Sequence, residues 1–175
     1  NTRAFFAESL GNPKLDVLDL QGISKFAKEA KVPFIVDNTV ATPYLLNPIE
    51  HGANIVIHSL TKYVNGNGTA MGGIIIEGGT FNYGNGLFPE FTDPSPNYHG
   101  LNYHEALGPA AFIARVRVEG LRDLGAAPSP FNSFQILQGI ETLSVRMSNH
   151  SKNALELAQW LESQDKVKWV NYPGL

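Results

Sequence analysis

The chain has no cysteine, which excludes disulfides and thiolate metal sites and is compatible with the cytoplasmic location we expect. It also has no apolar stretch long enough to span a bilayer, so we expect no membrane partner. Basic side chains are few and scattered, with 13 Lys and Arg against 16 Asp and Glu and a formal net charge of -3. A nucleic acid calls for a clustered basic surface, so we expect no nucleic acid partner either.

The chain does have enough apolar material for a folded core. Its 175 residues are 43% hydrophobic and 17% charged, which is typical of a globular protein and not of a disordered one. The first residue is Asn1, just before a strand-like run, and the C-terminal residues follow directly on another one. We therefore expect an internal piece of a longer protein.

Apolar runs and a helical periodicity alternate over the first sixty residues. The runs at residues 4–7, 34–36 and 55–57 predict buried strands. Apolar residues at helical spacing predict a helix after Asp19, its N-cap, and residues 43–51 predict a short helical segment closed by Gly52. This order indicates an α/β sheet with crossovers, in which ligands sit outside the carboxyl ends of the strands.

The second half of the chain is less regular. A strand is predicted at residues 74–76, and a long loop rich in Gly, Pro, Asn and aromatic residues follows, from Gly78 to about Tyr103. The Pro- and Gly-containing segment 125–130 is the candidate domain boundary. The remaining elements that the pattern predicts are helices at about 105–124, 131–147 and 151–161 and a strand at 167–170.

One cluster of polar residues lies at the predicted strand ends. Asp37 ends the second strand, and Ser59, Thr61 and Lys62 follow the third. A lysine amine condenses with the aldehyde of pyridoxal 5'-phosphate (PLP), and an aspartate keeps its pyridine nitrogen protonated. The hydroxyls of Ser59 and Thr61 are suited to the phosphate. The set therefore predicts a PLP site.

Each of these residues also has a plainer interpretation. A lysine taken alone is usually a surface charge, and an aspartate at a strand end more often caps a turn or a helix. Hydroxyls near strand ends frequently bond only the local backbone, and Asn12 before Pro13 is a typical turn residue. The histidines lack metal-ligand spacing, and the glycines around Gly66 lack a dinucleotide-binding context, so neither a metal nor a dinucleotide is predicted.

Three segments resemble successive motifs of one enzyme family, the Cys/Met-metabolism (transsulfuration) PLP enzymes. They are residues 8–13 (ESLGNP), 36–43 (VDNTVATP) and 58–63 (HSLTKY). Residues 137–150 are similar to the helix that opens the family's smaller domain, so the resemblance covers essentially the whole chain. Residues 67–73, 88–100 and 108–114 are most similar to the O-acetylhomoserine sulfhydrylase branch.

The resemblance implies a fold and a set of roles. The fold would be α/β, PLP-dependent transferase fold type I (aspartate-aminotransferase-like), with 1–125 the C-terminal part of the large PLP-binding domain and 126–175 the beginning of the smaller domain. Lys62 would be the catalytic, cofactor-bound lysine. Asp37 would pair with the pyridinium nitrogen and Asn12 with the ring hydroxyl. The remaining cofactor contacts would be made by Ser59 and Thr61 at the phosphate and by Thr39 near the ring.

The resemblance also implies an activity. The parent protein would be a transferase of methionine and cysteine biosynthesis that makes homocysteine from O-acetylhomoserine and sulfide by γ-replacement. Family membership implies a homotetramer built as a dimer of dimers. A cystathionine or methionine γ-lyase would share every cofactor residue named here, and the isolated chain would be a non-catalytic fragment if the rest of the pocket lies outside it. We do not assign the substrate carboxylate to Arg115, Arg117 or Arg146.

Overall fold

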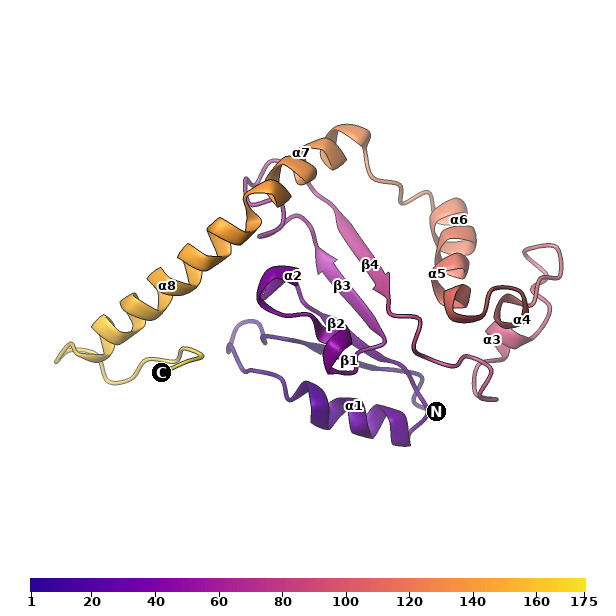
Figure 1. The fold of residues 1–175 in the computed structure, drawn as a ribbon, viewed down its shortest axis with the longest axis horizontal. Coiled ribbons are helices and arrows are strands. Elements are labelled where there is room, and N and C mark those ends of the chain that lie inside the picture. The colour runs from indigo at the N-terminus through magenta and orange to yellow at the C-terminus, as the bar shows by residue number, and fades with distance from the viewer.

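A computed structural model describes all 175 residues and contains one four-stranded sheet, with the strand order β1-β2-β3-β4 (Figure 1). Its strands are Phe5–Glu8 (β1), Phe34–Asp37 (β2), Ile55–Ser59 (β3) and Gly73–Glu77 (β4). The first three are parallel, and β4 runs antiparallel to β3. The predicted mostly parallel α/β sheet is confirmed.

The helix predicted after Asp19 is α1, Leu20–Glu29, which crosses over between β1 and β2. The carboxylate of Asp19 accepts a hydrogen bond from the backbone N–H of Gly22 at 2.9 Å, as the N-cap prediction requires. Helix α1 packs Leu20 and Ala27 against the strand residues Phe34, Val36 and Val56 in the main core of the sheet. The core thus fixes β2 and β3 next to each other.

The segment between β2 and β3 forms two short turns of helix, α2 at Thr42–Leu45 and a 3₁₀ turn at Pro48–His51. Gly52 ends the second turn with φ 94°, a left-handed conformation that suits glycine, which confirms the predicted closing residue. This compact connection returns the chain to β3 within a few residues.

The long loop after β4 contains one short helix, α3 at Pro89–Thr92, and is held by an aromatic core. The side chains of Tyr83, Phe88 and Tyr103 are almost fully buried together with Phe91. A second contact is polar, because Glu119 accepts hydrogen bonds from Tyr103 and Ser95, both at 3.2 Å. The loop is therefore a packed element of the fold.

The continuous helix predicted at about 105–124 was wrong. The structure has α4 at Tyr103–Leu107, α5 at Ala111–Arg115 and α6 at Arg122–Leu124. A 3₁₀ turn at Gly108–Ala110 separates α4 from α5, since Pro109 has no N–H to donate and Gly108 has φ 51°. The stretch Val116–Leu121 is π-helical.

Residues 125–129 form no helix or strand and are the linker to two helices, α7 at Pro130–Glu141 and α8 at Leu143–Glu162. The predicted break near 148–150 was wrong, and the break lies at Thr142 instead. Asn149 has a low helix propensity, and its side-chain amide donates a hydrogen bond at 3.1 Å to the carbonyl of Val145, one turn back in the same helix. In Figure 1 α8 extends well beyond the sheet. None of the helices combines the length and the apolar character that crossing a membrane requires.

The strand predicted at residues 167–170 was also wrong, because the structure has no regular element after α8. Trp169 is 77% exposed, and the strands of the sheet lie elsewhere in the chain. A strand forms only where a partner accepts its backbone hydrogen bonds, and this segment has none in the chain.

The N-cap of α1 gives a test of the fold. Asp19→Ala leaves the Gly22 N–H without its side-chain acceptor, and we expect the free energy of unfolding to fall by about 1 kcal/mol. Asp19→Asn keeps an acceptor oxygen and serves as the matched control. Urea unfolding of the three proteins measures the effect, and equal stability of Asp19→Ala and the wild type would show that the cap does not stabilise α1.

Candidate active site

A cavity of about 700 Å³ lies at the carboxyl ends of the parallel strands. This volume is in the usual range for small-molecule sites. Its lining includes all six residues predicted as the site, namely Asn12, Asp37, Thr39, Ser59, Thr61 and Lys62.

Parallel pairing explains why residues so far apart in the sequence meet. Glu8 at the end of β1 is in register with Asp37 at the end of β2, and Asp37 is in register with Ile57 of β3. Ser59 ends β3, and Lys62 lies in the turn that follows. The chain thus delivers a carboxylate, a hydroxyl and an amine to one edge of the sheet.

The end of β2 is tied to the end of β3 through Thr39. The carboxylate of Asp37 accepts the Thr39 backbone N–H at 2.9 Å, and the Thr39 hydroxyl oxygen accepts the Ser59 backbone N–H at 2.8 Å. Both bonds are partly buried. One Asp37 carboxylate oxygen is therefore fixed by the backbone, and Thr39 connects the two strand ends as well as lining the cavity.

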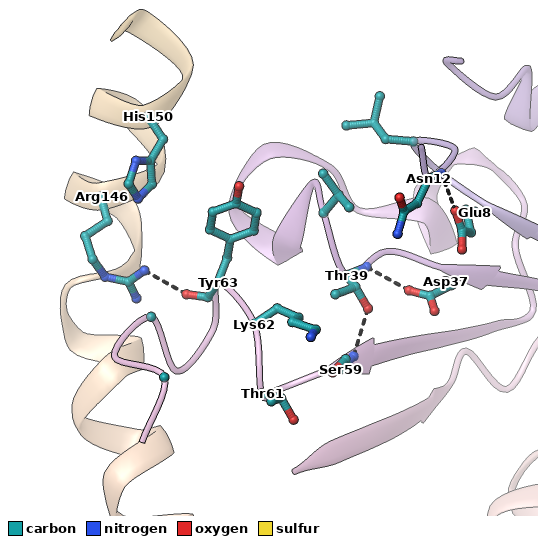
Figure 2. Close-up of a pocket in the computed structure, with 14 residues that line it drawn as sticks. Glu8, Asn12, Asp37, Thr39, Ser59, Thr61, Lys62, Tyr63, Arg146 and His150 are labelled. Carbon is teal, nitrogen blue, oxygen red and sulfur yellow. Dashed lines mark hydrogen bonds between the residues drawn. The ribbon is translucent and has the colours of Figure 1, made fainter. Parts of the chain in front are cut away.

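The Lys62 side chain is exposed and takes part in no ion pair. Figure 2 shows its amine directed into the cavity, toward Thr39 and Ser59. Its backbone is held in a turn, with the N–H donating to Ser59 O at 3.2 Å and the carbonyl accepting from Gly66 N at 2.8 Å. The backbone is thus fixed while the amine stays free to react.

The two hydroxyls near Lys62 differ in their partners. The Thr61 hydroxyl donates to Gly72 O at 3.2 Å and accepts from Gly72 N at 3.1 Å. It thus bonds the backbone, as in the plainer interpretation of a hydroxyl near a strand end. The Ser59 hydroxyl makes no hydrogen bond within the chain, although its backbone does. Ser59 is the better prepared of the two to donate to an anion, and Thr61 would first have to rotate.

Asn12 enters the cavity from the turn after β1. The Glu8 carboxylate accepts the Asn12 backbone N–H at 2.7 Å, so a side chain at the strand end fixes the turn. The Asn12 side-chain amide has no partner within the chain and points into the cavity in Figure 2.

Sequence reasoning did not assign the other eight of the fourteen lining residues to the site, and four of these have polar or charged side chains: Glu8, Tyr63, Arg146 and His150. Arg146 and His150 are one helical turn apart on α8 and share a face, and the ring of His150 lies 5.6 Å from that of Tyr63. The spacing of four residues between Arg146 and His150 is visible in the sequence. The sequence does not show which part of the chain this helix face contacts, because a break was predicted where α8 in fact continues.

His58 lies beside the site on β3 and is only 5% exposed. Burial lowers its pKa below the ordinary value of 6.5, against the smaller raising effects of the Asn38 backbone and the Asp37 charge. The folded protein therefore resists protonation of this ring, whereas the unfolded chain does not.

This difference predicts a pH-dependent stability. As the pH falls through 6.5, the unfolded state takes up a proton at His58, so the free energy of unfolding falls and levels off below the folded pKa. Urea unfolding between about pH 5 and pH 8 measures the change. His58→Gln should lose less stability on acidification than the wild type, and parallel curves for the two proteins would refute the assignment.

A family model described as Cys/Met metabolism PLP-dependent enzyme matches residues 1–175. The chain belongs to this family. An O-acetyl-L-homoserine sulfhydrylase of Leptospira meyeri is 59% identical over 99% of this chain and 41% of its own length. An O-acetyl-L-homoserine sulfhydrylase 1 of Thermus thermophilus is 50% identical over 99% of the chain and 42% of its own length.

Solved structures agree with the family assignment. A protein of Campylobacter jejuni described as an O-acetylhomoserine (thiol)-lyase, which carries N'-pyridoxyl-lysine-5'-monophosphate, is 47% identical with a TM-score of 0.94. The similarity covers 100% of this chain and 44% of that one. The metB protein of Corynebacterium glutamicum is 31% identical with a TM-score of 0.73, over 100% of this chain and 37% of that one. The PLP-dependent α/β fold expected from the resemblance is confirmed, and the chain spans about two-fifths of the relatives' length.

Proposed function

We propose that the cavity binds pyridoxal 5'-phosphate and that Lys62 is the residue attached to it. The donor set fits the cofactor. Lys62 is the one lysine that lines the cavity, its amine is free, and Asp37 supplies a carboxylate with one oxygen fixed by Thr39. The unpartnered Ser59 hydroxyl and Asn12 amide suit the phosphate and the ring hydroxyl, with Thr61 as a second phosphate donor and Thr39 near the ring.

The observation that carries the proposal is the convergence of an amine and a carboxylate from different strand ends on one cavity. When bound, PLP supplies an electron sink for bonds at the amino acid's Cα. Asp37 would hold a proton at the pyridine nitrogen, which such a sink requires. Lys62 would hold the cofactor through its aldehyde carbon, and its free amine would be the base that takes the proton from Cα.

The activity proposed for the parent protein is supported by its relatives. The sulfhydrylases of Leptospira meyeri and Thermus thermophilus support γ-replacement, in which sulfide replaces the acetyl-bearing oxygen of O-acetylhomoserine to give homocysteine and acetate. A homocysteine synthase of Schizosaccharomyces pombe is 47% identical and supports the same product. Substrates and activity belong to the whole protein, since this chain spans 41% of the first of these relatives.

Three further expectations belong to this proposal, and each rests on membership of the family. Residues 1–125 form part of the PLP-binding large domain and 126–175 the beginning of the smaller one, and the boundary falls in residues 125–129, which form no helix or strand. The parent protein is a homotetramer, and it works in the cytoplasm.

Replacement of the lysine tests the cofactor site. In the parent protein, Lys62→Ala should abolish the visible absorbance of lysine-bound PLP, because no other amine lies in the cavity. Lys62→Arg keeps the positive charge and should lose the absorbance as well, whereas Lys25→Ala, on the exposed surface of α1, should keep it. A visible band of unchanged intensity in Lys62→Ala would refute the assignment.

The reaction itself is tested by the products. With O-acetylhomoserine and sulfide the parent protein should give homocysteine, and without sulfide it should release little ammonia or 2-oxo acid. Equal release of ammonia and 2-oxo acid with or without sulfide would identify a γ-lyase instead.

Titration of PLP into the isolated 175-residue chain gives a separate test, in which we expect weak binding because this chain is a piece of the whole.

A further inference from the structure

Arg146 is a cation in the wall of the cavity whose role the proposed function leaves open. It comes from α8, far along the chain from Lys62, and lines the end of the cavity away from Asp37 (Figure 2). A guanidinium in a site for an amino acid is an obvious candidate for the substrate carboxylate. Its hydrogen bonds indicate a different use.

The guanidinium is occupied by groups of the chain itself. It has five N–H donors, and four hydrogen bonds account for all but one of them. The acceptors are Tyr63 O at 2.7 Å, Gly139 O at 2.7 Å, Val64 O at 3.4 Å and Thr142 Oγ1 at 3.0 Å. Two-point binding of a carboxylate needs two free donors on one side, which Arg146 does not have.

Two of these acceptors are the carbonyls directly after Lys62. Tyr63 and Val64 lie in the turn that carries the lysine, while Gly139 and Thr142 lie at the junction of α7 and α8. Arg146 therefore connects the lysine turn to the helix pair. The planar, forked geometry of the guanidinium lets one side chain hold both, which a lysine in its place could not do.

The surrounding packing brings the two parts close enough for this connection. A Cβ at Gly139 would lie 2.1 Å from Asn65 O, so the backbone of α7 rests directly on the turn. Val64, Ala70 and Ile136 form a small buried core beside it. A Cβ at Gly66 would lie 2.4 Å from the Arg146 guanidinium, so the turn is fitted closely around that group.

The other side of Lys62 is held independently. Thr61 is bonded to Gly72 through its backbone N–H, at 3.3 Å, and through its hydroxyl. Lys62 thus lies between an anchor to the start of β4 and an anchor to α8. The hydrogen bonds of the second anchor all come from one side chain, that of Arg146.

We propose that Arg146 is a positioning residue for Lys62: it holds the lysine turn against α7 and α8 and so sets where the amine lies in the cavity. This inference rests on the proposed role of Lys62. It makes Arg146 part of the support of the lysine and removes it as the receptor of the substrate carboxylate.

The test uses the full-length parent protein with Arg146→Met, Arg146→Lys and the control Arg117→Met. Arg117 is a surface arginine outside the cavity, and its side chain makes no hydrogen bond within the chain. Two quantities are measured. One is hydrogen exchange of the backbone amides of residues 60–66 in PLP-free protein, which is independent of turnover. The other is the pair kcat and KM for O-acetylhomoserine with PLP bound.

We expect Arg146→Met to speed exchange in the turn at least about tenfold and to lower kcat about 10- to 100-fold, with KM changed by less than about threefold, because a misplaced catalytic group costs rate and not binding. Arg146→Lys should fall between Met and wild type, and it carries the test if the Met variant does not fold. Arg117→Met should match the wild type in both quantities.

Three results would overturn the inference. A KM raised about 100-fold with exchange unchanged would make Arg146 the carboxylate receptor. Faster exchange with unchanged kcat would make its role purely structural, and unchanged exchange with a lowered kcat would contradict the mechanical link. A wild-type protein that does not bind PLP would refute the proposed function itself, and the exchange data would still report whether Arg146 holds the turn.

Discussion

The parallel pairing of β1, β2 and β3 is the constraint on which the rest of this structure depends. Parallel strands all end at the same edge, so whatever residues follow them are brought together there. Asp37 and Ser59 are twenty-two positions apart in the sequence, yet one threonine side chain bridges the ends of their strands. Without this pairing the carboxylate and the lysine turn would have no common cavity. The buried contacts of α1 with Phe34, Val36 and Val56 stabilise the pairing.

The site itself combines rigid backbone with free side-chain atoms. Glu8 fixes the Asn12 turn, Thr39 fixes one oxygen of Asp37, and Ser59 and Gly66 hold the backbone of Lys62. The Lys62 amine, the Ser59 hydroxyl and the Asn12 amide have no partner within the chain. Such pre-organisation limits the ordering that a bound molecule would have to impose, which is how a site keeps binding energy for chemistry. Arg146 extends the same principle to the helix pair that follows the linker.

The sequence allowed the sheet and six of the fourteen residues that line the cavity to be predicted, and the errors have definite physical causes. Apolar runs predicted the four strands. Asp19 was predicted as a helix N-cap and Gly52 as the residue that closes a helical segment, and both predictions depend only on local sequence. The helix predicted at 105–124 is interrupted at Gly108 and Pro109. The apolar periodicity continues across these two helix-breaking residues, so the pattern by itself does not show the interruption. The strand at 167–170 failed because strand formation needs a partner edge, which no local pattern can supply. The break predicted between the helices 131–147 and 151–161 was wrong, since α8 runs through residues 148–150.

What the sequence by itself determined is the chemistry: an amine, a carboxylate, an amide and hydroxyls at strand ends, in motifs typical of one PLP-dependent family. Only the tertiary structure decided which of these groups are free and which are hydrogen-bonded within the chain, because a local sequence pattern does not predict hydrogen bonds between distant segments. It paired the Thr61 hydroxyl with Gly72, left that of Ser59 open, and brought Arg146 from α8 onto the carbonyls that follow Lys62.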